Sequence, residues 1–201
     1  GYVQRAGVNV PGMLIARVDR GHPMAGFDGY LDREATEERV LRDVFEPGDL
    51  WFVSGDLLRQ DADGDFWFVD RLEDVVRTKD GPVFTRAVED LLYRRPDVKM
   101  VSVYGLVHEG ESVVVAAIVP RERSLDFARL AELVREKLAP HERPRFVRIV
   151  GAIPMTDGYR PLKRALAAEG LAGVVHRLGE DGAYHRIDAT NGHGDRAASR
   201  A

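Results

Sequence analysis

The chain has 201 residues, of which 44% are hydrophobic and 31% are charged, so it can bury one good core or two small ones. No apolar run reaches the roughly 18 residues of a membrane-spanning helix, and the segment GYVQRAGV lacks the basic and apolar parts of a secretory signal, so we expect a soluble, cytoplasmic protein. The absence of cysteine excludes disulfides, thiolate metal ligands and a cysteine nucleophile, and the net charge of −4 argues against a nucleic-acid partner.

The N-terminal third of the sequence predicts strands and one helix. Residues 11–19 alternate loosely in the manner of a strand. Residues 32–45 carry apolar side chains on one helical stripe, and the helix is expected to stop at the sequence EPGD, where proline and glycine disfavour its continuation. Two aromatic strands, 51–54 and 65–70, flank an Asp63-Gly64 corner and predict a β-hairpin.

The remainder of the sequence mixes helices and strands. Helices are predicted over 86–94, over 124–138 with Ser124 as N-cap, and over LKRALAAEG before Gly170. The runs VKMVSVYGLV and ESVVVAAIVP predict a second hairpin, RFVRIV predicts a short strand, and PMTDGYRP predicts a loop. The expected fold class is therefore α+β.

A change of character near Asp70 to Asp74 predicts a domain boundary. Residues 1–70 are expected to form one β-rich unit, and residues 71–178 a small α/β unit. The segment 179–201 has few apolar residues to offset the entropy of ordering, so we expect a flexible tail.

Three aspartates in the first hairpin have the spacing of a calcium-binding loop. Asp61, Asp63 and Asp65 occupy its first, third and fifth positions, but Phe66 and Leu72 stand where that loop needs glycine and glutamate. We therefore interpret these aspartates as turn-stabilising residues and expect no metal site.

Two charged residues at strand ends are candidates for binding a nucleotide. A carboxylate such as Asp56, in the sequence Ser-Gly-Asp, can accept hydrogen bonds from both hydroxyls of a ribose. Arg71, in the sequence Asp-Arg-Leu-Glu-Asp, can add donors to sugar or phosphate. On these residues alone, a simple ion pair between the two remains open.

The order of four segments resembles one enzyme family. They are FDGYLDREATEERVLRDVFEPGDLWFVSGDLL, DADGDFWFVDRLEDVVRTK, LAPHERPRFVRIV and IPMTDGYRPLKRALAAEGL. From about Pro11 to Leu171 the sequence resembles the C-terminal part of very-long-chain acyl-CoA synthetases of the fatty-acid transport protein type, within the adenylate-forming superfamily.

The resemblance implies a two-step reaction with ATP, Mg²⁺ and coenzyme A. ATP activates a carboxylate as an acyl-adenylate with loss of pyrophosphate, and coenzyme A then attacks to give the thioester and AMP. In the family the aspartate equivalent to Asp56 holds the ribose and the arginine equivalent to Arg71 reaches the nucleotide. Glu73 falls at the hinge about which a C-terminal lid rotates.

The sequence also departs from the family pattern. Lys79 to Val83 read KDGPV where the family commonly has K-G-E-N-V, and Arg160 stands at the position of the catalytic lysine. Arginine keeps the charge but changes its geometry, so either Arg160 or Lys163 is predicted to clamp the developing charge.

Three functions remain open on the sequence. The first is the C-terminal portion of an ATP-dependent synthetase for a long or very long fatty acid, incomplete without the N-terminal part of the same protein. The second is a diverged adenylate-forming enzyme that activates another acid, for example nitrite, without coenzyme A. The third is a degenerate lid that acts as an interaction module. Members of this family are often membrane-associated, but nothing in this sequence is an anchor.

Overall fold

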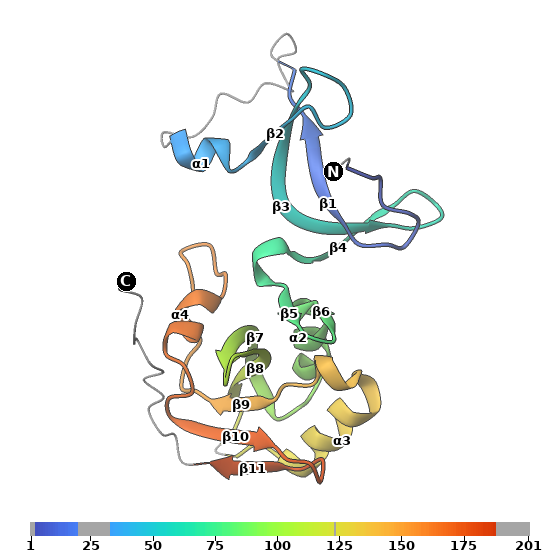
Figure 1. Ribbon diagram of the computed structural model, residues 1–201. Helices are drawn as coiled ribbons and strands as arrows, with labels where there is room; N and C mark the ends of the chain where they lie inside the picture. Colours follow the sequence, from blue (N-terminus) through green and yellow to red (C-terminus); the bar gives the residue numbers. More distant parts are fainter. Residues whose placement is uncertain (1–2, 20–32, 123, 188–201) are drawn as a thin grey trace. The chain divides into compact units, whose positions relative to one another are not determined.

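The computed structural model describes residues 3–19, 33–122 and 124–187 (Figure 1). The chain divides into two compact units, Gly1–Glu73 and Asp74–Ala201, and the division falls inside the segment where the sequence changes character. No helix among the described residues is long and apolar enough to cross a membrane. The units are described separately below.

The N-terminal unit is a four-stranded antiparallel sheet built on one long strand, β3 (Leu50–Gln60). β1 (Gly12–Arg17) pairs along one edge of β3, while β2 (Val40–Arg42) and β4 (Phe66–Arg71) pair with successive parts of its other edge. The β3–β4 hairpin predicted around Asp63-Gly64 is confirmed, with Gly64 in the left-handed region at φ 94°.

The helix predicted over 32–45 is mostly wrong. The helix α1 ends early (Arg33–Glu37), residue 32 lies outside the described part, and the strand β2 follows. Val44, Phe45 and Glu46 donate their amide protons to the carboxylate of Asp49 instead of to helical carbonyls. Pairing with β3 and this carboxylate cap outweigh the helical spacing of the apolar residues.

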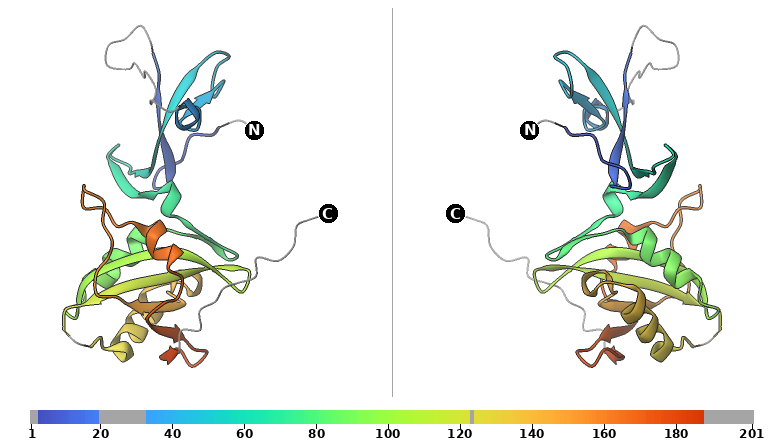
Figure 2. Two further views of the ribbon diagram at one scale, coloured as in Figure 1. Left: turned by 90° about the vertical axis from the view of Figure 1, so that its left-hand side faces the viewer. Right: turned by 90° about the vertical axis from the view of Figure 1, so that its right-hand side faces the viewer.

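The C-terminal unit contains a mixed five-stranded sheet in the order β11-β10-β9-β8-β7. Its strands are β7 (Val98–His108), β8 (Glu111–Pro120), β9 (Phe146–Ile149), β10 (Val174–Leu178) and β11 (Tyr184–Ile187), and only the β8–β9 pair is parallel. The long β7–β8 hairpin, yellow-green in Figure 2, confirms the second predicted hairpin. A short hairpin of β5 (Val76–Thr78) and β6 (Gly81–Val83) precedes this sheet in the chain.

Helices cover both faces of this sheet. α2 (Thr85–Tyr93) and α3 (Phe127–Lys137) contribute to one core cluster, and α4 (Lys163–Ala168) contributes Leu166 to the other. Successive residues of β8 alternate between the two clusters, with Val114 in one and Val115 in the other. A strand buried on both faces is apolar at every position, which explains the continuous run VVVAAIV. The α+β prediction is confirmed.

Two boundary predictions in this unit were wrong. The N-cap of α3 is Asp126, whose carboxylate accepts the amide proton of Arg129, and not Ser124. The flexible tail was predicted to begin at residue 179, which is too early. The strand β11 pairs with β10, and the buried Tyr184 donates its hydroxyl proton to the carbonyl of Pro144. One aromatic anchor thus orders a polar segment; residues 188–201 lie outside the described part.

A buried arginine fixes the C-terminal end of α4. Arg148, only 2% exposed, donates to the carbonyls of Leu166 and Ala172, to the hydroxyl of Tyr104 and to the carboxylate of Glu169. These carbonyls lie at and just beyond the helix end, where intrahelical donors are missing. The guanidinium therefore joins α4 to the sheet.

Replacing Arg148 with methionine is expected to lower the free energy of unfolding of the C-terminal unit by about 3 kcal/mol. The substitution fills a similar volume but leaves Tyr104 and two carbonyls without their donor. Urea denaturation followed by circular dichroism measures the change. Arg177→Met on the exposed side of β10 is the matched control, and equal stability of both variants would contradict the assignment.

Candidate nucleotide-binding and lid residues

Asp56 and Arg71 lie side by side in the N-terminal unit. They are paired positions on β3 and β4, and the Arg71 Nη2 is 3.4 Å from the Asp56 Oδ1. Both side chains stay partly accessible, at 31% for Arg71 and 29% for Asp56. Within the described residues the Asp56 Oδ1 is a buried oxygen that accepts no hydrogen bond and has only the ion pair with Arg71, so part of its acceptor capacity is unused.

The backbone around Asp56 requires glycine at the preceding position. Gly55 has φ 82°, and a Cβ there would lie 2.6 Å from the Arg39 Nη1. That guanidinium donates to the carbonyl of Ser54, and the Ser54 hydroxyl accepts the amide proton of Asp56. Arg39 is thus a second cation beside the Ser-Gly-Asp sequence, which sequence reasoning missed because it was placed inside a longer helix.

The prediction that aspartates stabilise the hairpin corner is confirmed for Asp61. Asp61 accepts the amide protons of Asp63 and Asp65 on one carboxylate oxygen, and the Trp67 indole proton on the other. The bond from Trp67 lowers the pKa of the Asp61 carboxyl, with the amide bonds acting in the same direction. Both oxygens of Asp61 therefore already have donors.

The chain passes from one unit to the next through a single 3-10 turn, Leu72–Asp74. Glu73 is the last residue of the N-terminal unit and Asp74 the first of the C-terminal unit. Such a short element at a unit boundary offers few backbone hydrogen bonds to break when its dihedral angles change.

Arg160 lies in the loop that precedes α4, orange in Figure 2. An isolated bridge between Met155 and Pro161 closes the loop, and Thr156 bonds the backbone of Arg160 in both directions. The side chain of Arg160 is exposed. Its neighbour Tyr159 is 88% exposed with φ 57°, a conformation that costs a non-glycine residue about 1 kcal/mol.

Lys163 differs from Arg160 in its surroundings. Its side chain is only 10% exposed, and its ammonium lies within 3.4 Å of oxygen atoms of Thr85, Glu89 and Asp74. These partners were missed by sequence reasoning, although Thr85 and Glu89 are four residues apart and therefore share one face of α2. The structure brings Asp56 together with Arg71, and Lys163 together with Asp74.

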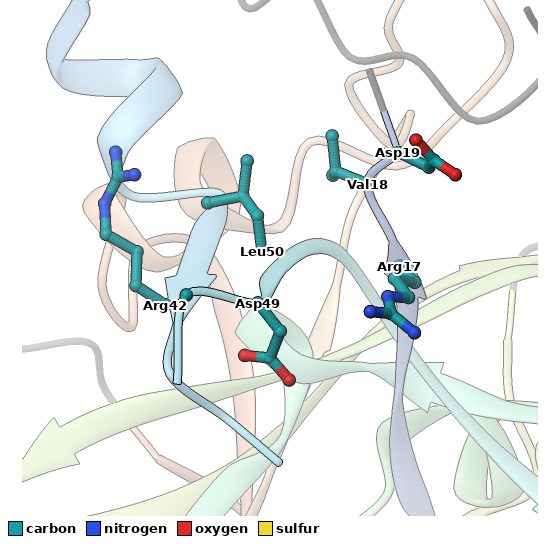
Figure 3. Close-up of a pocket in the computed structure, with 7 residues that line it drawn as sticks. Arg17, Val18, Asp19, Arg42, Asp49 and Leu50 are labelled. Carbon is teal, nitrogen blue, oxygen red and sulfur yellow. The ribbon is translucent and has the colours of Figure 1, made fainter. Parts of the chain in front are cut away.

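A pocket in the N-terminal unit lies beside the end of β1 (Figure 3). Its lining residues are Arg17, Val18, Asp19, Arg42, Gly48, Asp49 and Leu50. Arg17 and Arg42 pair with Glu46 and Glu37. The Asp49 carboxylate accepts protons from three amides and from the Trp51 indole. These charges support the fold, and we assign the pocket no ligand.

Comparison with known proteins identifies relatives of the chain. Residues 87–158 match the family model of the AMP-binding enzyme C-terminal domain. The chain is 37% identical over 177 residues to a very long-chain fatty acid transport protein of Cochliobolus heterostrophus, covering 85% of this chain and 27% of that protein. It is 37% identical over 166 residues to a medium/long-chain-fatty-acid–CoA ligase of Mycobacterium tuberculosis, covering 81% of this chain and 27% of that protein.

Solved structures give a matching picture. The amide bond synthetase McbA of Marinactinospora thermotolerans superposes with a TM-score of 0.68 at 29% identity, covering 83% of this chain and 32% of that chain. The o-succinylbenzoate coenzyme A synthetase of Bacillus subtilis in complex with ATP and magnesium ion has the same fold, with a TM-score of 0.66 at 22% identity, covering 81% and 32%. The chain thus spans about a quarter to a third of the proteins that it matches.

The acid stability of the N-terminal unit is expected to depend on Asp49. Burial raises the pKa of its carboxyl, but hydrogen bonds from Trp51, Phe45, Val44 and Glu46 outweigh burial and lower the pKa to about 2. The unfolded carboxyl titrates near roughly 3.9. The stabilisation is therefore complete above that pH and is lost as the pH falls toward 2.

Urea unfolding between pH 2 and 6, followed by the fluorescence of Trp51 and Trp67, which both lie in the N-terminal unit, measures this dependence. Asp49→Asn should remove part of the pH dependence, whereas Asp65→Asn at the hairpin corner is the control and should keep it. An Asp49→Asn variant whose stability changes with pH as in the parent would contradict the assignment.

Proposed function

We propose that this chain is the C-terminal portion of an ATP-dependent acyl-CoA synthetase. The premise is that the chain belongs to the adenylate-forming enzymes and carries their AMP-binding C-terminal domain. Its proposed substrates are ATP with Mg²⁺, a long or very long fatty acid, and coenzyme A. The relatives named as fatty acid transport proteins and fatty-acid–CoA ligases support this choice. The N-terminal part of the same protein is its first partner, because the chain spans only about a quarter of those relatives.

The observation that carries the proposal is the pair of Asp56 and Arg71. A partly exposed carboxylate with unused acceptor capacity suits the two hydroxyls of a ribose, and an adjacent guanidinium suits the sugar or a phosphate. The pair stands at the end of β4, directly before the boundary between the units. In this proposal it forms one edge of the adenosine site, and Glu73 is the hinge of the lid.

The chemistry that we assign to the parent protein has two steps. A carboxylate oxygen of the fatty acid attacks the α-phosphorus of ATP, and the bond to pyrophosphate breaks. The thiolate of coenzyme A then attacks the acyl carbonyl, and AMP leaves with the electrons of the acyl–oxygen bond. In this proposal Mg²⁺ enters with the phosphates of ATP.

Arg160 is the cation that we assign to the first step. Negative charge grows on the oxygens around the α-phosphorus, and a fixed positive group next to them lowers the barrier. The exposed Arg160 side chain sits on a loop whose backbone is held by Thr156, whereas the ammonium of Lys163 already has three protein partners. These surroundings favour Arg160 over Lys163 as the clamp.

A second candidate function keeps adenylate formation and changes the acceptor. The likeness to an amide bond synthetase at 29% identity favours it, because that enzyme is named for forming an amide bond and not a thioester. The altered Lys79 to Val83 segment and the arginine at position 160 are compatible with such divergence. Consumption of coenzyme A separates the two functions, because only the synthetase requires the thiol to release AMP.

Arg160→Ala in the complete protein is expected to lower kcat for acyl-dependent pyrophosphate release by roughly 10²-fold to 10³-fold. Arg160→Lys should retain most of the activity, because it keeps a cation at the loop. Arg129→Ala replaces a highly exposed arginine on α3 and is the matched control. An unchanged rate in Arg160→Ala would remove the catalytic lid from the proposal and leave the interaction-module hypothesis.

Asp56→Asn in the same protein is expected to raise KM for ATP by about tenfold or more, since an amide offers one acceptor oxygen where the carboxylate offers two. Isothermal titration with AMP measures the same loss without turnover. The control is Asp63→Asn in the exposed hairpin corner. If Asp56 only pairs with Arg71, the variant will lose stability while nucleotide affinity stays constant.

A further inference from the structure

The ammonium of Lys163 is surrounded by three oxygen atoms of the C-terminal unit, one in a hydrogen bond and two in ion pairs. It donates to the Thr85 hydroxyl at 2.7 Å, and it lies 3.0 Å from the Glu89 Oε1 and 3.4 Å from the Asp74 Oδ2. An ammonium has three protons to donate, and three protein oxygen atoms around it compete with any substrate for them.

These partners come from different layers of the unit. Lys163 begins α4 on one face of the sheet, while Thr85 and Glu89 belong to α2 on the opposite face. The edge strand β7 lies between them, and the Glu89 Oε1 also accepts the outward-facing amide proton of Val103. The lysine therefore joins the two helical layers around the edge strand β7. The Val103 amide, which points away from the sheet, is bonded to Glu89.

The third partner, Asp74, is the first residue of the C-terminal unit. Two residues later, Val76 packs on Gly105 of β7 so closely that a Cβ at Gly105 would lie 3.2 Å from both Val76 methyl carbons. The chain that leaves the 3-10 turn is therefore held at two points, by the ammonium of Lys163 and by the contact with Gly105.

The loop that carries Arg160 is joined to the same lysine. Leu162, directly before Lys163, donates its amide proton to the carbonyl of Pro154 at 2.8 Å, and Thr156 donates to the carbonyl of Arg160 at 2.8 Å. Lys163 fixes one end of this closed loop, and Arg148 holds the far end of α4 on the sheet. A displacement of Lys163 is thereby transmitted to Arg160.

We propose that Lys163 is a positioning residue, which locks the Arg160 loop to Asp74 at the exit of the hinge so that the two move as one body. This inference rests on the proposed function, in which Arg160 is the cation that acts on the substrate. It assigns Lys163 a different task from the clamp that its sequence position suggested. Lys163 sets where the charge of Arg160 stands and does not touch the substrate itself.

Amide hydrogen exchange on the 201-residue chain tests the lock without any activity. In Lys163→Met the amides of Thr156 and Leu162 should exchange about tenfold faster or more, because their loop loses its anchor. Lys163→Arg should restore part of the protection. The control Lys137→Met removes an exposed lysine that pairs with the adjacent Glu136.

Unchanged protection at the Val115 amide in the buried strand β8 verifies that each variant is folded. Equal exchange at Thr156 and Leu162 in the parent and in Lys163→Met would overturn the inference. If Lys163→Met does not fold, Asp74→Asn is the replacement variant, because it leaves the contacts with Thr85 and Glu89 in place. The same faster exchange is then expected, and its absence would be equally decisive.

Kinetics of the complete protein separate positioning from a direct catalytic role. Lys163→Met and Asp74→Asn should each lower kcat for pyrophosphate release by about tenfold or more with KM for ATP unchanged, and the double variant should lose no more than the stronger single one. A loss of kcat in Lys163→Met alone, with normal exchange and normal Asp74→Asn, would make Lys163 the clamp instead. If the complete protein forms no adenylate but Lys163→Met still exchanges faster at Thr156 and Leu162, the proposed function is refuted. The anchoring of the loop by Lys163 is then still supported.

Discussion

The C-terminal unit depends on one constraint, which is that β8 is apolar on both faces. Val114, Ala116 and Ile118 point into one core, and Val115 and Ala117 into the other, so water must be excluded from both sides of the strand. Helices must then cover both faces, and the chain supplies α2 and α3 for one and α4 for the other. The position of the Arg160 loop is a consequence, since that loop is the entry to the helix that closes the second face.

Apolar packing brings the layers together, and two buried cations fix their register. Arg148 reaches from β9 to the C-terminal end of α4 on the same face of the sheet, and Lys163 reaches around the β7 edge from the start of α4. Each cation is surrounded by enough oxygen atoms to offset the loss of its hydration, which an apolar contact of the same size would not require. Such directional bonds allow only one placement of α4, whereas apolar side chains alone tolerate several.

The sequence predicted the features that are encoded locally. Both hairpins, α2, α3 and the loop before α4 follow from turn residues and from apolar periodicity. The helix expected over 32–45 failed because Val40 to Arg42 pair with β3, a partner distant in the sequence, and β11 was missed because Tyr184 is anchored by the carbonyl of Pro144. The ion pair of Asp56 and Arg71, which the sequence left open, joins the two strands of one hairpin. The contacts of Lys163 with Asp74 and Thr85 join residues far apart in the sequence, and no local pattern indicated them.

Lys163 and Arg160 have different surroundings, and this difference matches the two roles that we propose for them. A lysine in the interior must give its three protons to three nearby oxygens, which the compact site at Lys163 provides. A loop residue that approaches an extended array of phosphate and carboxylate oxygens faces a different demand. The planar guanidinium of arginine offers several donors over a wider area and stays charged at every physiological pH. Thr156 holds the backbone of Arg160, and in our proposal Lys163 anchors the loop. The long arginine side chain can therefore reach several oxygen atoms although its backbone is fixed. If Arg160 is the clamp, as proposed, its side chain differs from that of a lysine in shape and reach, while its backbone is held by Thr156.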